Sequence, residues 1–180
     1  AAGRSPDEVT LVAVSKTHPA PLVLEAVKAG LRHFGENRVE EASDKIPLVN
    51  AETEADIVWH MIGHIQSHKA KDVIPLFQRV HSVDSARLAG KLAAAAERAG
   101  RRLDVLLEIN ISGETSKYGI DAAGWERDLA VRERVWDQVR TIAALPALQV
   151  RGLMTMAPIV AQAELTRPVF AGLAALRDEL

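Results

Sequence analysis

Short apolar, β-branched runs alternate along the chain with longer stretches whose apolar residues recur at helical spacing. This alternation predicts strand–helix units around a parallel sheet, because parallel strands are usually joined by a helical crossover. The predicted strands are residues 10–15, 31–35, 58–62, 79–83, 105–111 and 150–154. The predicted helices are residues 20–30, 38–46, 85–99, 121–145 (as one helix or two) and 164–180.

Local signals mark where several of these helices begin and end. Gly30 is expected to close the first helix, and Asp84 and Gly100 bracket the alanine-rich helix 85–99. Asn37 is followed three positions later by Glu40, as in a capping box. We therefore expect helix 38–46 to begin directly after Asn37.

The number of units bears on the fold class. A closed parallel (β/α)8 barrel takes eight strand–helix units and usually at least about 200 residues. Six strands are predicted here, and the chain stops at Leu180 in what reads as the middle of a helix. We expect one α/β domain over residues 1–180, a TIM-type barrel truncated after about six strands, with a complete six-stranded open sheet as the alternative.

Composition and charge narrow the functional classes. The net charge of −2 and the pI near 6.3 give no electrostatic reason to expect nucleic acid or an anionic membrane as partner. The absence of cysteine excludes disulfides, a thiolate nucleophile and cysteine metal sites. No run approaches 18 apolar residues, and the first residues lack a secretory signal, so a cytoplasmic location is expected.

Lys16 is the strongest candidate for chemistry. It ends the apolar segment 10–15 and is followed by His18 and Pro19. The carboxyl ends of barrel strands are where such folds place their reactive groups. A lysine shielded from water there is more easily held neutral for imine formation. The alternative is a strand-end lysine that reaches solvent.

Other predicted strand ends carry further candidates. Asn37 follows the second strand, where its amide either binds a ligand or caps the next helix. Lys117 lies in the polar loop after the fifth strand, either as a second amine near the mouth or as a solvated lysine. Met154 ends the sixth predicted strand. Its side chain either packs in the core or wall of the barrel or contacts a cofactor.

Three histidines recur at intervals of four residues. On one helix, His60, His64 and His68 would align their imidazoles as metal ligands. Residues 59–62 are predicted to form a strand and Gly63 a turn, so we expect His60 to lie apart from the other two histidines. We place His64 and His68 on a helix face, and we do not expect a metal site. The chain also contains neither a Walker-type loop nor a Gly-x-Gly-x-x-Gly turn.

Five ordered blocks of sequence carry a resemblance to a known family. They are Ala-Val-Ser-Lys-Thr (13–17), Phe-Gly-Glu-Asn-Arg-Val (34–39), Trp-His-Met-Ile-Gly-His-Ile-Gln-Ser (59–67), Asn-Ile-Ser-Gly-Glu-Thr-Ser-Lys (110–117) and Arg-Gly-Leu-Met-Thr-Met-Ala-Pro (151–158). In this order and spacing they resemble the pyridoxal phosphate homeostasis protein family, over nearly the whole chain.

The resemblance implies a barrel like that of alanine racemase, a fold type III protein of pyridoxal 5′-phosphate (PLP). It implies PLP held covalently on Lys16 as an internal aldimine, with Asn37, His60 and Met154 lining the cofactor. Lys117 matches a lysine outside the primary site that is connected with cofactor transfer. The implied role is a monomeric carrier or buffer of PLP without established turnover, in transient contact with apoenzymes that use PLP.

The chain departs from the family pattern in several places. His68 stands where asparagine is common, and Tyr118 where a small residue is common. Family members also continue through two more strands with Ser-x-Gly-Met-Ser and Arg-x-Gly motifs, which hold the phosphate and face the pyridine nitrogen. We therefore expect the natural protein to be longer and its phosphate grip to lie outside these residues.

Two other functional classes use the same lysine. A PLP-dependent amino-acid racemase needs two opposed bases, commonly lysine and tyrosine, and part of its site from a second domain. Tyr118 is the one tyrosine of the sequence. A cofactor-free Schiff-base aldolase needs an acid–base partner for Lys16 that the sequence alone does not locate.

Overall fold

The computed structural model describes residues 3–180 and arranges seven parallel strands in one sheet. Strands β1 to β5 are paired in chain order, and β6 and β7 both pair with β5. The strands are β1 (Ala13–Val14), β2 (His33–Glu36), β3 (Val58–Met61), β4 (Arg79–Val83), β5 (Leu103–Asn110), β6 (Ile120–Asp121) and β7 (Leu148–Met154). The carboxyl ends of all strands therefore lie along the same edge of the sheet.

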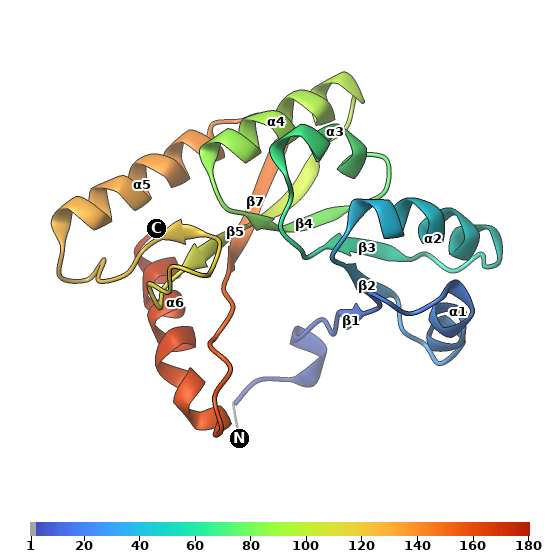
Figure 1. Cartoon of the computed structure of the whole chain (residues 1–180), viewed down its shortest axis with the longest axis horizontal. Helices are drawn as coiled ribbons and strands as arrows, with labels where there is room; N and C mark the ends of the chain where they lie inside the picture. Colours follow the sequence, from blue (N-terminus) through green and yellow to red (C-terminus); the bar gives the residue numbers. More distant parts are fainter. Residues whose placement is uncertain (1–2) are drawn as a thin grey trace.

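Helices cover one side of this sheet. They are α1 (Ala20–Lys28), α2 (Val39–Ala51), α3 (Ala70–Val73), α4 (Ala86–Arg98), α5 (Leu129–Ala143) and α6 (Arg167–Glu179). In Figure 1, α1 to α5 follow one another around the outside of the curved sheet, and α6 follows β7. This is the arrangement of a (β/α) barrel that is open on one side, so the predicted fold class is confirmed.

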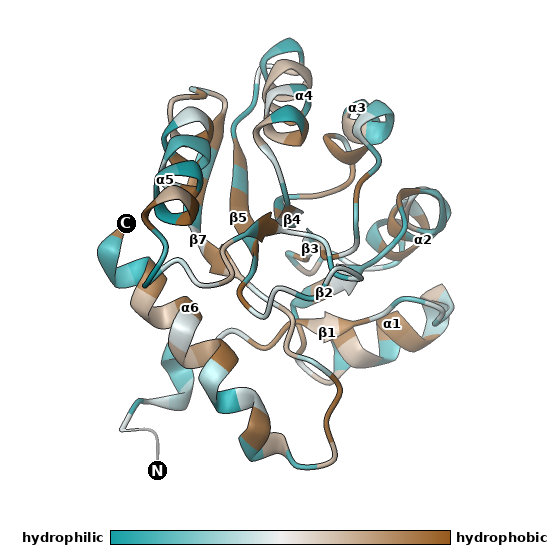
Figure 2. Cartoon of the chain, turned by 60° about the vertical axis from the view of Figure 1, so that its left-hand side comes forward, coloured by the Kyte–Doolittle hydropathy of each residue, from teal (hydrophilic) through white to brown (hydrophobic). Residues whose placement is uncertain are grey.

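The hydrophobic core lies between the sheet and these helices. The odd-numbered β5 residues Leu103, Val105, Leu107 and Ile109 are almost completely buried there. Figure 2 shows brown apolar segments in the central strands, while α2 and α5 alternate between teal and brown as amphipathic helices do. Within residues 3–180, no helix has both the length and the apolar character needed to cross a bilayer.

The six predicted strands correspond to β1 to β5 and β7, and the two-residue β6 was not predicted. The short helix α3 was not predicted either, and two predicted helices have wrong boundaries. Helix α2 does not stop at residue 46 but runs to Ala51 with Pro47 inside it, because Ile46 and Val49 on either side are both buried in the core. Helix α5 begins only at Leu129, since Gly124 turns the chain at φ 75° and Asp128 caps the helix.

The structure contradicts the alternative in which Asn37 caps the next helix. The residue at the N-cap of α2 is Arg38, and no side chain caps this helix. Asn37 instead lies between β2 and α2, with its backbone tightly packed against Gly63. A Cβ atom on Gly63 would lie 2.2 Å from the Asn37 carbonyl oxygen. The amide of Asn37 is thus left without the structural role that its sequence context favoured.

Candidate functional site

The face of the sheet opposite the helices, called here the inner face, carries the candidate site. Side chains alternate between the two faces along each strand. On β2 and β3, Phe34 and Trp59 point into the helix-covered core. Gly35 lies on the inner face, because a Cβ atom there would meet Ile62 at 2.9 Å and Val12 at 3.3 Å.

Lys16 follows β1 and belongs to this inner face. The preceding Ser15 is buried, and its hydroxyl donates to Glu36 Oε1, which also accepts from Lys45 of α2, so the Ser15 side chain faces the helices. Extending the alternation of β1 through Ser15 predicts the opposite side for the side chain of Lys16, which is the first residue of the turn after the strand. Continuing the pairing of Val14 with Gly35 by two positions places Lys16 beside Asn37.

The side chain of Lys16 is exposed, contrary to the shielded amine that the sequence suggested. The reason is the position of β1 at the end of the sheet, where it pairs only with β2 among the described residues. Strand β1 is short, and its Val14 is itself 49% exposed. An amine in this position is accessible to a small molecule that enters from the inner face.

Asn37 is half-buried at the carboxyl end of β2. Within residues 3–180 its side-chain amide makes no hydrogen bond, so both donor and acceptor are available to a ligand. The close approach of Gly63 fixes its backbone from the neighbouring strand end. The structure therefore brings Lys16 and Asn37 to one strand-end edge, as predicted for a site at the mouth of the barrel.

His60 lies deeper, in the middle of a chain of three imidazoles. Its Nε2 is 3.0 Å from His33 Nδ1, and its Nδ1 is 2.8 Å from His81 Nε2. Burial, with smaller contributions from His81, His33 and Arg79, lowers the pKa of His60 to about 3. Burial and Arg79 also lower the pKa values of His33 and His81. The rings are therefore neutral at physiological pH, and His60 has no free ring nitrogen for a ligand.

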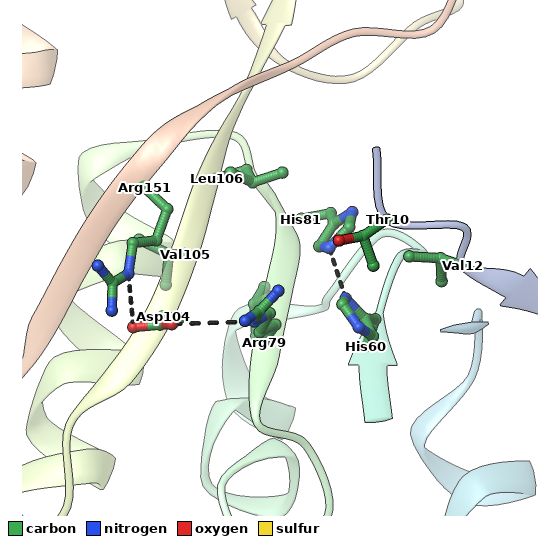
Figure 3. A pocket seen from close by; sticks show the side chains of 10 residues that line it. Thr10, Val12, His60, Arg79, His81, Asp104, Val105, Leu106 and Arg151 are labelled. Carbon is green, nitrogen blue, oxygen red and sulfur yellow. Dashed lines mark hydrogen bonds and ion pairs between the residues drawn. The ribbon is translucent and has the colours of Figure 1, made fainter. Parts of the chain in front are cut away.

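A cavity of about 470 Å³ opens beside these histidines on the inner face. In Figure 3, Arg79 and Arg151 flank Asp104, and His60 points toward His81 on the other side of the cavity. Asp104 lies 3.1 Å from Arg151 and 3.9 Å from Arg79. His60 thus forms part of the wall of this cavity, whose lining does not include Lys16, Asn37 or Met154.

Met154 ends β7 in register with Glu108 of β5 and is half-buried. Glu108 is only 7% exposed, and its carboxyl group makes no hydrogen bond or ion pair within residues 3–180. Burial, and secondarily the charge of Asp84, raises the pKa of Glu108 to about 7. The edge of the site near Met154 therefore contains a carboxyl group that titrates near neutrality, which the sequence interpretation missed. An acidic residue inside the apolar run of β5 was the available signal.

Lys117 is a bonded lysine in the loop between β5 and β6. Its Nζ is 2.5 Å from Glu114 Oε1 and 3.0 Å from the carbonyl oxygen of Met156. The second contact joins the loop to the segment that follows Met154. The structure thus brings Lys117 close to the residues that follow β7. The two alternatives from the sequence were a second amine near the mouth of the barrel and a solvated loop lysine.

The two remaining histidines lie apart from His60, as predicted, but neither is on an α-helix. His64 is in the loop after β3, where Nδ1 lies 3.1 Å from Asp84 and the ring stacks on Tyr118 with 3.8 Å between centroids. His68 is in the 3-10 turn Ser67–Lys69. Within residues 3–180, no three His, Asp or Glu side chains are placed to share a metal ion.

Comparison with known proteins identifies the family. The model of the alanine racemase N-terminal domain matches residues 2–180. The chain is 42% identical over 178 residues to the pyridoxal phosphate homeostasis protein of Escherichia coli K12, covering 95% of this chain and 72% of that protein. The chain belongs to the pyridoxal phosphate homeostasis protein family. The Pseudomonas aeruginosa PAO1 member is 40% identical over 180 residues, covering 100% of this chain and 73% of its own.

Solved structures agree with this family assignment. PipY of Synechococcus elongatus PCC7942, solved with PLP bound, superposes with a TM-score of 0.84 at 35% identity, covering 98% of this chain and 76% of PipY. Alanine racemase of Clostridium difficile 630 gives a TM-score of 0.68 at 13% identity, covering 97% of this chain and 44% of the racemase. The second similarity supports the barrel fold alone.

Proposed function

We propose that this protein binds PLP, holds it as an imine on Lys16, and acts in the homeostasis of the cofactor. The observation that carries the proposal is the position of Lys16, an accessible amine on the inner face at the carboxyl end of β1, beside the unbonded amide of Asn37. The names of the relatives and the PLP in the PipY structure point to the same ligand.

The proposed residues have distinct roles. Lys16 supplies the amine that condenses with the PLP aldehyde and releases one water molecule. Asn37 offers hydrogen bonds from the neighbouring strand end, and we assign His60 of β3 and Met154 at the end of β7 to the surroundings of the cofactor. Lys117, attached to the exit of β7, lies outside the primary site and takes part in the release of the cofactor.

PLP in this position would act as a carried cofactor. The chemistry that PLP supplies is electron withdrawal from carbon atoms attached to its imine. We propose a monomer in the cytoplasm that hands PLP to apoenzymes through brief contacts, without turnover of a substrate. Transfer is tested by mixing the PLP-loaded protein with a PLP-dependent apoenzyme and a scavenger of free PLP. Recovery of apoenzyme activity despite the scavenger is expected, and recovery that the scavenger abolishes would contradict direct transfer.

Borohydride reduction tests the proposed linkage. The protein is incubated with PLP, its visible imine absorption is recorded, and the sample is reduced and digested. We expect the pyridoxyl label on the peptide that contains Lys16. A label found only on peptides with Lys117 or with other lysines would refute the proposal. The absence of an imine band at saturating PLP would refute covalent binding altogether.

A further inference from the structure

A buried ionic network lies directly behind Lys16. Lys45 of α2 is 6% exposed, and its Nζ lies 2.8 Å from the Ser15 carbonyl oxygen, 2.8 Å from Glu36 Oε1 and 2.9 Å from Glu41 Oε1. An ammonium group has three protons to donate, and here each has an acceptor. Lys45 is therefore held as a charged structural donor and is not a second amine for imine formation.

The network holds the residue before Lys16 through several contacts. Ser15 donates its backbone N–H to Gly35 and its hydroxyl to Glu36 Oε1 at 2.6 Å. Its carbonyl oxygen accepts from Lys45 and from the backbone N–H of His18. The direction in which the chain leaves β1 is thus fixed by β2 and α2 together.

The residue after Lys16 is held by the same network. The backbone N–H of Thr17 donates to Glu41 Oε1 at 2.5 Å, the oxygen that also accepts from Lys45. Thr17 has φ 65°, in the left-handed region, which a β-branched residue rarely adopts. Such a conformation persists where surrounding contacts enforce it. At this turn the contacts are the backbone bond from His18 N–H to the Ser15 carbonyl oxygen, which spans Lys16 and Thr17, and the bond from Thr17 to Glu41.

The network depends on Lys45. Glu36 is completely buried, and among the described residues its Oε2 has no hydrogen-bond partner. Its charge is balanced at Oε1 alone, by Lys45 and Ser15. A buried carboxylate that loses its cation is strongly destabilised. Removal of Lys45 would therefore disturb both attachments of the turn.

We propose that Lys45 and Glu41, together with Glu36, are positioning residues that fix the turn carrying Lys16, so that its amine meets the PLP aldehyde in a productive geometry. This inference rests on the proposed function. Small displacements of a reacting group have large effects on rate, on the order of 100-fold for about 1 Å. The network contacts the backbone on both sides of Lys16, at Ser15 and at Thr17.

The decisive variant is Glu41→Ala, because Glu41 is 30% exposed and its loss does not threaten folding. We expect faster hydrogen exchange of the Thr17 amide in the cofactor-free protein and imine formation slowed by at least about tenfold. Binding of pyridoxine 5′-phosphate, which has no aldehyde, should stay within about twofold of wild type because the pocket is retained. Glu41→Gln keeps an oxygen acceptor and should restore most of the rate. Lys45→Met should reproduce the defect of Glu41→Ala or exceed it.

Glu40 and Lys69 provide a matched control, since they form an exposed ion pair between α2 and the neighbouring turn. Glu40→Ala and Lys69→Met should leave Thr17 exchange and imine formation unchanged. Unchanged exchange or unchanged imine formation in Glu41→Ala would overturn the inference, as would an equal loss of pyridoxine 5′-phosphate binding. A wild-type protein without an imine would instead refute the proposed function, whereas a normal wild type with unaffected variants refutes only the network.

Discussion

At the scale of single residues, the site combines an accessible amine with groups whose protonation is set by burial. Lys16 is exposed at the end of β1, while Glu108 and His60 are almost completely enclosed. The exposed residue contributes little packing, and the buried ones couple their protonation to folding. Substitutions at these positions should therefore separate ligand binding from stability.

Lys16→Ala should abolish covalent retention of PLP and leave the free energy of unfolding within about 0.5 kcal/mol of wild type, because the side chain is exposed. Borohydride trapping and urea unfolding measure the two effects. Lys117→Ala is the control and should retain the label. A reducible imine in Lys16→Ala would show that another lysine is sufficient.

Glu108→Gln should change how stability depends on pH. The pKa of Glu108 is raised from 4.5 to about 7, so the folded protein retains a proton that the unfolded chain has lost. This contribution to stability is complete below pH 4.5 and is lost as pH rises to about 7. The wild type should lose up to about 3 kcal/mol relative to Glu108→Gln across this range. Urea unfolding at several pH values measures the free energy of unfolding of both proteins. The same pH dependence in the wild type and in Glu108→Gln would contradict the raised pKa of Glu108.

At the scale of elements, a glycine after β3 allows the carboxyl ends of β2 and β3 to lie close together. A Cβ atom on Gly63 would lie 2.7 Å from the Cα of Asn37, which the backbone cannot relieve without moving the strand ends apart. The candidate site therefore depends on a residue that supplies no functional group. The prediction of Gly63 as a turn was confirmed, but its contact with Asn37 follows only from strand pairing.

Gly63→Ala should lower the free energy of unfolding by about 1 to 3 kcal/mol, the usual cost of overpacking. It should also weaken PLP binding, because Asn37 is displaced. Gly90→Ala in α4 is the control: a Cβ atom there meets nothing within 4 Å, and alanine stabilises a helix relative to glycine by about 0.5 to 1 kcal/mol. Chemical unfolding of both variants tests this, and equal stabilities would contradict the predicted clash.

At the scale of the whole molecule, hydrogen bonds between uncharged histidine rings connect three strands on the inner face. The chain of His33, His60 and His81 links β2, β3 and β4. Because burial keeps these rings neutral, acid should act on the protein as a whole by charging groups that the folded state holds uncharged.

The pKa of His60 is lowered from 6.5 to about 3, so its contribution to stability is present above pH 6.5 and is lost as pH falls toward 3. The expected loss is at most about 1.4 kcal/mol per pH unit for this group. His60→Gln should therefore lose less stability in acid than the wild type does. Urea unfolding between neutral and acid pH measures the free energy of unfolding of both proteins. An equally steep loss of stability in the wild type and in His60→Gln would contradict this prediction.

The sequence alone determined the order of the main strands and helices and the place of Lys16 at a strand end. These features depend on local periodicity and on short turn signals such as Gly30 and Gly100, which neighbouring residues encode. The resemblance of the five blocks to the family was confirmed by comparison. Asn37, Met154 and Lys117 were also placed correctly near strand ends or in loops, although their proposed roles remain predictions.

The tertiary structure alone decided which of these residues meet and how far each is buried. The histidine chain, the Lys45 network and the pairing of Met154 with Glu108 join residues far apart in the sequence. Such contacts depend on strand register, which shifts between Val80 and Val83 and between Val105 and Leu106. A register shift of one residue moves a side chain to the other face of the sheet. The partners that fix each shift belong to different strands, which lie far apart in the sequence.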